Sequence, residues 1–330
     1  MSLAAELRLV NGSTGDPLLY VDYPDADDAL LFDAGDNAAL PMERLADLTA
    51  VFVTHHHVDH FIGLDRIVRA NVDSDKRLTI HGPPGTIQKV YDRVRSYEYQ
   101  FFPFQKIVLD LVDIGPDTLT RARLECTRRF PPPEPVVEPR SGRTVFANGV
   151  CSVEALFVDH TVPCLAYALV EKSGWHIDRN ALSGGLLRPG DWIREVAKLL
   201  EAGADKETRV AAGGLSLSLG ELAGTYFRRT GGGRLAYVTD TLWSDGVREP
   251  LVSLCRGADV LYCDSFYAAA QRSAADKHRH MTTRDAAELA TRAKVAELVP
   301  MHFGGRYRGR YDALVEEIQG GFPRVSPRFV

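Results

Sequence analysis

Four histidines and an aspartate occupy six consecutive positions in the segment THHHVDH. Imidazole nitrogen and carboxylate oxygen suit a borderline divalent cation such as zinc. At the extended end of a strand alternate side chains point the same way, so His55 and His57 can face one ion. After the chain turns, Asp59 and His60 can face a second ion a few ångströms away. His56 is expected to point elsewhere.

Such a site needs more ligands, and later strand ends offer them. His160 closes the apolar run VEALFVDH, Asp240 closes RLAYVTD, and His302 closes ELVPMH. Singly, each is more commonly a turn former or a hydrogen-bonded core residue. Together they predict one site assembled at the level of the loops. A surface cluster of histidines is the alternative, but THHHVDH lies in mid-chain between an apolar strand and an apolar helix start.

Strand and helix patterns alternate along the whole chain and could position these residues. Strand-like runs fall at 29–35, 50–55, 78–82, 107–115, 153–160, 165–174, 234–241, 260–266 and 298–303. Helical patterns fall at 85–100, 191–203 and 282–294, the last opening on the capping-box pair Thr282 and Asp285. Mixed strands and helices predict a single α/β domain over residues 1–330. Within it, a Pro-rich extended loop is expected at 128–144 and a protruding arm at 174–214.

Composition excludes several classes of protein. The chain is 45% hydrophobic and 25% charged, unlike a disordered segment. A net charge of −5 argues against gripping nucleic acid with the whole surface, while a local basic patch stays open. Five dispersed cysteines without a CxxC pair predict a reduced, cytoplasmic protein whose metal ligands are not cysteines. The absence of a signal-peptide pattern and of a long apolar run predicts no membrane attachment.

THHHVDH matches the T-H-x-H-x-D-H signature of the metallo-β-lactamase superfamily, which the chain resembles. Segments similar to ribonuclease Z, the tRNA 3′-end-processing nuclease, follow in order: LLFDAGD (30–36), LTIHGPPGT (78–86), VDHTVPCLAYAL (158–169), ADVLYCDSFY (258–267), HMTTRDAAELA (280–290) and MHFGGRY (301–307). The resemblance implies an αββα sandwich, with two central mixed β-sheets flanked by helices. Val58, Asp264 and the Gly304-Gly305 pair depart from that family's usual Gly, Glu and Ser-Ser.

The resemblance also implies a complete set of metal ligands. His55, His57 and His160 would hold one ion, Asp59, His60 and His302 the other, and Asp240 would bridge them. The implied cofactors are two divalent metal ions, Zn²⁺ first, with Mn²⁺ or Fe²⁺ as alternatives. Two such ions about 3.5–4 Å apart activate a bridging water as hydroxide and stabilise charge on a phosphoryl or carbonyl oxygen.

Three residues carry the implied catalysis: His280, Asp264 and the ligand Asp59. A leaving alkoxide needs a proton, and His280 stands just ahead of a helix start, where the family has its catalytic histidine. Asp264 would orient the other ring nitrogen of His280. The alternative is that His280 is only a loop histidine, and His278 is its nearest competitor.

A proton-donating histidine favours phosphodiester cleavage over β-lactam hydrolysis. Arg306 and Tyr307 follow the last ligand and are expected to contact the substrate, although a solvated basic turn is an equal alternative for the arginines further on. The expected substrate is a phosphodiester, either RNA such as a precursor tRNA or a smaller molecule. The arm carries six positive and six negative side chains over 174–214, and this neutrality is a poor attraction for a polyanion.

The leading hypothesis is thus a dinuclear-metal hydrolase, a phosphodiesterase or ribonuclease Z-like endonuclease that forms a homodimer. One alternative is a small-molecule hydrolase of the same fold, acting on a lactone, a sulfate ester or a cyclic nucleotide. Another is a non-catalytic binding protein on a retained fold. The full ligand set argues against the last.

Overall fold

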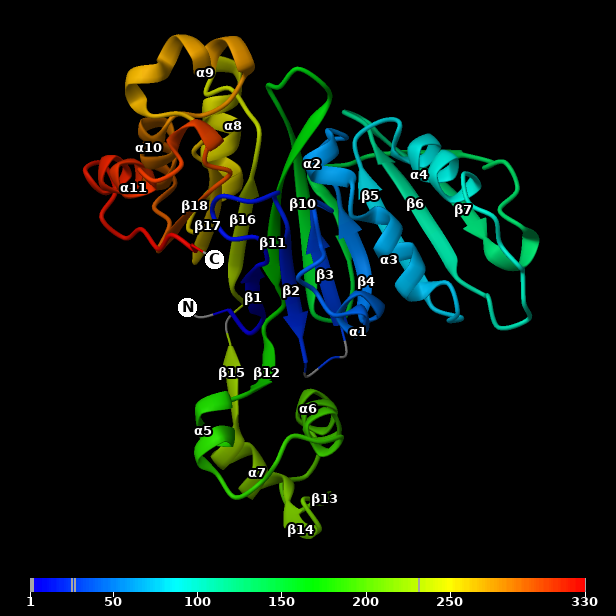
Figure 1. Ribbon diagram of the computed structural model, residues 1–330. Coiled ribbons are helices and arrows are strands. Elements are labelled where there is room, and N and C mark those ends of the chain that lie inside the picture. Colours follow the sequence, from blue (N-terminus) through cyan, green and yellow to red (C-terminus); the bar gives the residue numbers. More distant parts are fainter. Residues whose placement is uncertain (1–2, 25, 27, 231, 330) are drawn as a thin grey trace.

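Two β-sheets lie face to face at the centre of the structure, and helices cover the outer face of each (Figure 1). This computed structural model describes residues 3–24, 26, 28–230 and 232–329. Both sheets contain parallel and antiparallel pairs. The predicted αββα sandwich with two central mixed sheets is confirmed.

Within these ranges the first sheet has eight strands in chain order. They are β1 (Glu6–Leu9), β2 (Leu19–Tyr23), β3 (Asp28–Phe32), β4 (Leu48–Phe52), β5 (Arg77–Gly82), β6 (Val108–Ile114), β7 (Thr118–Glu125) and β8 (Val136–Pro139). The second sheet has the order β18 (Leu298–Met301), β17 (Val260–Asp264), β16 (Arg234–Val238), β11 (Cys164–Glu171), β10 (Cys151–Val158) and β9 (Thr144–Ala147). Strands β3 to β6 are parallel to one another, as are β16 to β18.

Apolar side chains fill the space between the sheets and beneath the helices. The helices over the first sheet are α1 (Met42–Ala46), α3 (Leu64–Asn71) and α4 (Thr86–Arg95), and those over the second are α8 (Asp245–Cys255), α10 (Thr283–Ala293) and α11 (Tyr311–Gln319). Between the sheets, the rings of Phe32 and Phe52 stack 5.1 Å apart, and Tyr167 packs against both. Burial of these rings stabilises the sandwich.

The local sequence explains the strands and the best-defined helix start. Strand β3 is almost continuously apolar because it is buried on both faces, as expected for a central strand of a covered sheet. Strand β10 alternates buried and half-buried residues, as its period-two pattern predicts. The predicted capping box of Thr282 and Asp285 begins α10.

The parallel strands place their carboxyl ends at one edge of the sandwich. The loop after β4 carries THHHVDH, β16 leads to Asp240, β17 ends on Asp264, and β18 leads to His302. Parallel neighbours end on the same side of a sheet, so segments far apart in sequence meet there.

The segment from β12 (Gly174–Ile177) to β15 (Phe227–Thr230) projects away from this sandwich (Figure 1). Strands β12 and β15 pair in antiparallel fashion at its base. Beyond them lie α5 (Arg179–Gly184), α6 (Trp192–Glu201), β13 (Arg209–Ala212), β14 (Leu215–Ser218) and α7 (Leu219–Tyr226), which share an apolar core. The projecting elements therefore continue past residue 214, because the strand that closes the base comes after α7. We call residues 174–230 the arm.

The Pro-rich segment 128–144 differs from its prediction as a loop. Strand β8 lies within it and pairs with β7 at the end of the first sheet. Pro139 is tolerated there because an edge strand needs hydrogen bonds on one side only.

Among the described residues, no helix is long and apolar enough to cross a membrane.

His81 is a buried histidine outside the strand-end cluster, and it makes the fold sensitive to acid. Its ring stacks on Phe52 at 4.9 Å, and neither ring nitrogen has a hydrogen-bond partner among the described residues. Burial, with a smaller effect of the Arg121 charge, lowers the pKa of His81 to about 3. The unfolded chain therefore binds a proton that the folded chain does not, and stability falls as pH drops from about 6.5 towards 3.

We predict that His81→Phe makes the protein less sensitive to acid. Between pH 7 and pH 5 the wild type should lose about 2 kcal/mol of unfolding free energy more than the variant, because only its unfolded state gains this proton. Urea unfolding of both proteins at the two pH values measures the difference. Equal losses in the two proteins would contradict the assignment.

Candidate metal centre

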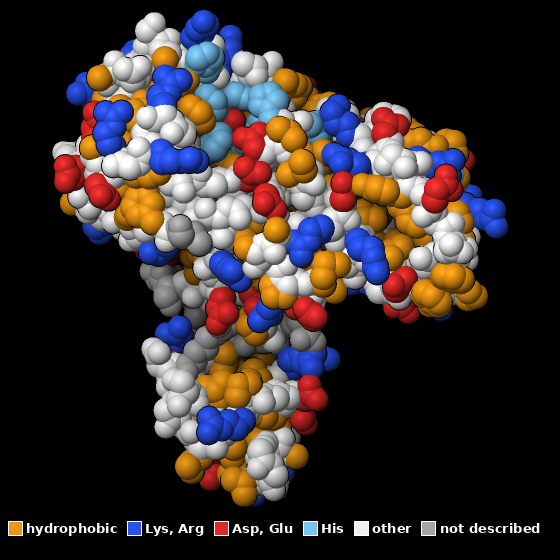
Figure 2. Space-filling view, viewed as in Figure 1, with side chains coloured by type: hydrophobic (Ala, Val, Ile, Leu, Met, Phe, Trp, Pro, Cys, Tyr) orange, Lys and Arg blue, Asp and Glu red, His pale blue; other side chains and the backbone are white. Residues whose placement is uncertain are grey.

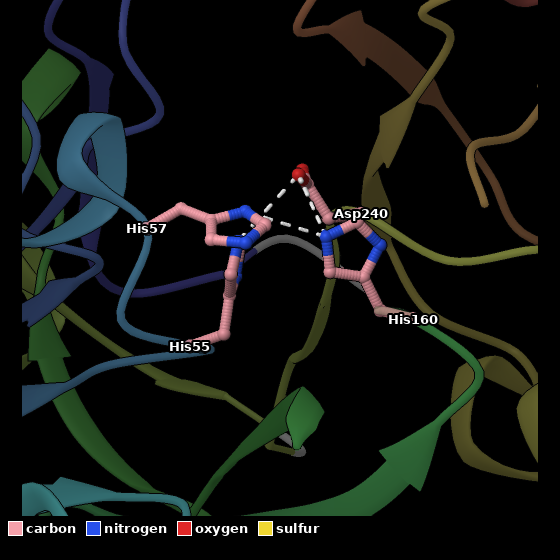
Figure 3. Close-up of side chains that lie close together, drawn as sticks. All are labelled: His55, His57, His160 and Asp240. Carbon is pink, nitrogen blue, oxygen red and sulfur yellow. Dashed lines mark hydrogen bonds and ion pairs between the residues drawn. The ribbon is translucent and has the colours of Figure 1, made fainter. Parts of the chain in front are cut away.

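Three separate loops bring His55, His57, His160 and Asp240 together (Figure 3). One potential ligand atom of each lies within 4.8 Å of those of the others. The rings of His55 and His57 are 4.5 Å apart, and Nε2 of His160 lies 3.4 Å from Nδ1 of His57. His57 has extended backbone and precedes α2 (Val58–Phe61), which turns the chain towards the next ligands.

Asp59, His60 and His302 form a second group beside the first. Oδ2 of Asp59 lies 3.6 Å from Nε2 of His60 and 3.3 Å from Nε2 of His302. Asp59 stands in the first turn of α2 and His60 in its last, so one short helix supplies two members of the group.

The carboxylate of Asp240 turns one oxygen to each group. Oδ2 lies 3.6 Å from Nε2 of His55 and 3.7 Å from Nε2 of His160. Oδ1 lies 3.4 Å from Nε2 of His60 and 3.0 Å from Nδ1 of His302. This arrangement is the one that a bridging ligand between two metal ions requires.

The atoms that face the centre of the cluster are better suited to bind a cation than to form hydrogen bonds with one another. Nε2 of His55, Nε2 of His60, Nδ1 of His302 and Oδ1 of Asp240 are buried and make no hydrogen bond with any described residue. Buried polar atoms are normally paired. Imidazole nitrogens and a carboxylate that converge without pairing suit Zn²⁺ or a similar ion.

The outward-facing nitrogens are held by other groups. Nδ1 of His60 lies 2.8 Å from the carboxylate of Asp33. Nδ1 of His160 donates to the backbone carbonyl of Arg279 at 3.0 Å, and Nδ1 of His55 lies 3.1 Å from Oγ1 of Thr54. A hydrogen bond on one ring nitrogen fixes the ring and leaves the other nitrogen directed inward, as in metal-ligating histidines.

The buried carboxylates give the pocket a strong preference for positive charge. Burial opposes charge on His60, yet Asp240 and Asp33 raise its pKa to about 10. Burial likewise opposes ionisation of Asp59, yet the hydrogen bond from His302 and the charge of His60 lower its pKa to about 2. At His55, burial and then the neighbouring His60 outweigh the effect of Asp240 and lower the pKa to about 2. A divalent cation would satisfy the same carboxylates.

His280 lies at the edge of this cluster and is oriented by Asp264. Nδ1 of His280 is 3.1 Å from Oδ2 of Asp264, and Nε2 is 3.9 Å from Oδ2 of Asp240. The fully buried Asp264 also accepts from the backbone N–H groups of Phe266 and Met281. Both of its oxygens are thus engaged, which favours an orienting role for Asp264 over metal ligation.

The other sequence-predicted residues lie around the cluster. His56 points away as expected, and its Nε2 lies 2.8 Å from Oγ1 of Thr86. The exposed guanidinium of Arg306 lies 4.8 Å from the centre of the Tyr267 ring. Tyr307 is 9% exposed, and its hydroxyl accepts from the backbone N–H of Ala268, so it is part of the core under the helices.

Asp33 is the most consequential residue to which the sequence analysis assigned no role. Its carboxylate accepts from the backbone N–H and hydroxyl of Thr54 and from the hydroxyl of Tyr237, besides facing His60. It lies in LLFDAGD, directly after β3, and that strand-end position was the available indication. Asp33 supports both ligand groups, since Thr54 also contacts Nδ1 of His55.

Close backbone approach explains three glycines near the cluster. A Cβ on Gly63 would lie 2.3 Å from the carbonyl oxygen of Gly35, and a Cβ on Gly35 would lie 2.5 Å from that of Asp59. A Cβ on Gly304 would lie 2.9 Å from the ring of Phe266. That ring stacks on His280 at 4.4 Å, so the small residue at 304 accommodates a ring that fixes His280.

The fold and site define the class of protein. A family profile described as a beta-lactamase superfamily domain matches residues 25–130. The metallo-beta-lactamase fold protein YhfI of Bacillus subtilis has a TM-score of 0.55 at 16% identity, with 98% of this chain and 96% of that chain covered. Human tRNase Z, short form, has a TM-score of 0.53 at 17% identity, with 92% and 93% covered. The chain is a metallo-β-lactamase-fold protein.

Sequence comparison finds relatives that match most of the chain. Ribonuclease Z of Deinococcus radiodurans is 29% identical over 283 residues, which cover 84% of this chain and 83% of that protein. Ribonuclease Z of Nanoarchaeum equitans is 26% identical over 287 residues, which cover 85% and 76%. Over most of its length the chain is thus similar to ribonucleases Z, the similarity that the sequence motifs predicted.

We predict that Asp33→Asn weakens metal binding roughly 10–100-fold, the usual effect of removing a carboxylate that orients a ligand. An amide cannot accept from Thr54, Tyr237 and His60 together. Tyr237→Phe is the matched control, because it removes one donor and leaves the carboxylate. Competition with a chromophoric chelator measures affinity, and equal affinities for Asp33→Asn and wild type would contradict this role.

Proposed function

We propose that the protein is a metal-dependent phosphodiesterase of the ribonuclease Z type, an endonuclease that acts on RNA. The observation that carries the proposal is the carboxylate of Asp240, which presents one oxygen to each of two groups of ligands. His55, His57 and His160 would hold one divalent ion and Asp59, His60 and His302 the other. When bound, such ions supply hydroxide at neutral pH and stabilise charge on a phosphoryl oxygen.

His280 would supply the proton that the leaving alkoxide needs. Its Nδ1 is held by Asp264 and its Nε2 is directed towards the ligand cluster. An imidazole that is held by a carboxylate at one nitrogen and faces the reacting phosphate with the other suits general-acid catalysis.

A positive side chain near the cluster suits an anionic substrate. Figure 2 shows the histidines gathered in one patch of the surface, with Asp and Glu side chains directly against it and Lys and Arg side chains further out. The exposed guanidinium of Arg306 lies over the Tyr267 ring, which is 6.1 Å from the ring of His280. A cation at this place favours a phosphodiester over a neutral ester or lactam.

We propose Zn²⁺ as the ion, because five of the seven proposed ligands are histidines and the other two are the aspartates Asp59 and Asp240, and Zn²⁺ accepts both kinds of ligand at low coordination number.

We also propose a homodimer in the cytoplasm. All five cysteines are free and buried, which suits a reducing compartment. The exposed rings of Phe102 and Phe104 stack at 5.1 Å beside a cavity of about 630 Å³ and offer an apolar contact surface.

A smaller phosphodiester is the second candidate substrate, and the arm favours it. Extending the count from residue 214 to 230 adds Arg228, Arg229 and Glu221, so the arm has eight positive and seven negative side chains. Leu186 on the arm is 93% exposed. A nearly neutral arm with an exposed leucine gives little electrostatic attraction for RNA.

Two alanine variants separate metal binding from proton transfer. Asp240→Ala should lose bound metal and hydrolysis of bis(p-nitrophenyl) phosphate together, because both ligand groups share this carboxylate. His280→Ala should keep the metal and lose roughly 10²–10⁴-fold in kcat on a substrate with an alkoxide leaving group. His278→Ala is the control and should leave both properties close to wild type.

Elemental analysis and steady-state kinetics measure these outcomes. We expect about two ions per wild-type chain, and a wild type that binds no divalent metal would contradict the proposed function. Loss of metal in His280→Ala would show that His280 is a ligand instead.

A salt series decides between the two substrates. If RNA is the substrate, the wild type cleaves a precursor tRNA with a 3′ trailer, and its apparent affinity falls steeply with added salt as counterions compete. Hydrolysis of bis(p-nitrophenyl) phosphate, which carries one charge, should change little over the same series. Cleavage of the small diester without cleavage of precursor tRNA would contradict the RNA assignment.

A further inference from the structure

Arg279 connects two loops of the candidate metal centre through a left-handed backbone. It ends α9 (Arg272–His278) with φ 57° and ψ 53°, and its N–H donates to the carbonyl of Ala275. This conformation is unfavourable for a residue with a Cβ, and glycine is the usual choice at such a helix end. An arginine there requires a compensating interaction.

The backbone of Arg279 contacts one loop and leads into the other. Its carbonyl oxygen accepts from Nδ1 of His160 at 3.0 Å, which leaves Nε2 of His160 facing His57 and Asp240. The next residue is His280. The peptide group between Arg279 and His280 therefore holds the His160 ring and leads directly into His280, which faces the cluster from the other side.

The side chain of Arg279 supplies the compensating interaction. Its guanidinium forms an ion pair with Asp159, the residue before His160. The backbone of Asp159 is fixed as well, because its carbonyl accepts from the N–H of Leu242 at 2.8 Å and its N–H donates to Oγ1 of Thr241 at 3.2 Å. The ion pair thus joins the loops that carry His160, Asp240 and His280.

We infer that Asp159 and Arg279 are positioning residues that hold the His160 ring in its metal-binding tautomer and set the place of His280. The inference deepens the proposed function and depends on it for the roles of those two histidines. The ion pair is not needed to end α9, because a glycine at position 279 would make the same turn with less strain. The pair therefore has a role beyond ending the helix.

The structure provides a matched control for the backbone. Lys294 ends α10 in the same left-handed conformation, with φ 57° and ψ 42°, at the end of that helix away from Thr282. Lys294→Gly and Arg279→Gly therefore relieve the same kind of strain, and only the second also removes the contact with Asp159. Arg279→Lys keeps a positive charge that can reach the carboxylate, and Asp159→Asn removes the negative charge.

The test compares these variants in the full-length protein loaded with Zn²⁺. We expect Arg279→Gly and Asp159→Asn each to lose roughly 10–100-fold in Zn²⁺ affinity and in kcat for a phosphodiester with an alkoxide leaving group, with KM little changed. The double variant should be no worse than either single one, because both remove one interaction. Arg279→Lys should recover part of the loss, and Lys294→Gly should match wild type in affinity and kcat.

A measurement on metal-free protein keeps the inference separate from the proposed function. Long-range ¹H–¹⁵N NMR of the imidazoles should find His160 protonated at Nδ1 in wild type and in Lys294→Gly, and mixed tautomers in Arg279→Gly and Asp159→Asn. A wild type that binds no metal would overturn the proposed function. Unchanged tautomers, with Zn²⁺ affinity and kcat like those of wild type in Arg279→Gly, would overturn the positioning role.

Discussion

The buried carboxylate of Asp240 is the group on which the arrangement of the site depends. It is 2% exposed, and the imidazoles of His55, His60, His160 and His302 face its two oxygens. Burial favours the neutral acid, but the neighbouring His302 and His60 hold the pKa of Asp240 well below its usual range. A buried carboxylate of this kind is costly without a compensating positive charge. The two groups of side chains are therefore coupled electrostatically through this carboxylate.

Backbone conformations at the cluster show that the fold holds these side chains in place at a cost in free energy. Asp33, Asp240 and His302 have positive φ values of 59°, 20° and 59°, and each directly follows or lies just beyond a strand of the central sheets. Aspartate and histidine tolerate such conformations better than most residues, yet each still costs of order 1–3 kcal/mol. Strands β3 and β16 are paired on both sides, and β18 is buried and pairs with β17 at the edge of its sheet, so all three can hold such a turn. The stability of the sandwich thus maintains the geometry of the site.

Sequence patterns indicated which residues the structure brings together better than they indicated the contacts that support them. His160, Asp240 and His302 each follow an apolar run, and the remaining members of the cluster lie in the single motif THHHVDH. The hydrogen bonds around Asp33 could not be named in this way, since Tyr237 and Asp33 lie 204 residues apart in the chain. The pairing of β15 with β12 likewise placed the end of the arm after α7. Such contacts depend on tertiary packing, which single-sequence patterns do not report.

On the proposed function, the sandwich and the arm would contribute differently to the binding of a polyanion. Arg306 lies over the Tyr267 ring next to His280 and places a positive charge near the ligand groups, where a scissile phosphate would lie. The arm balances its charges and presents the exposed Leu186. Charge near the reacting bond strengthens interaction with the transition state as well as with the ground state. On the proposed function, attraction of a phosphate to the site would therefore depend on Arg306 and the bound ions, and selection by the arm would depend on shape and apolar contact.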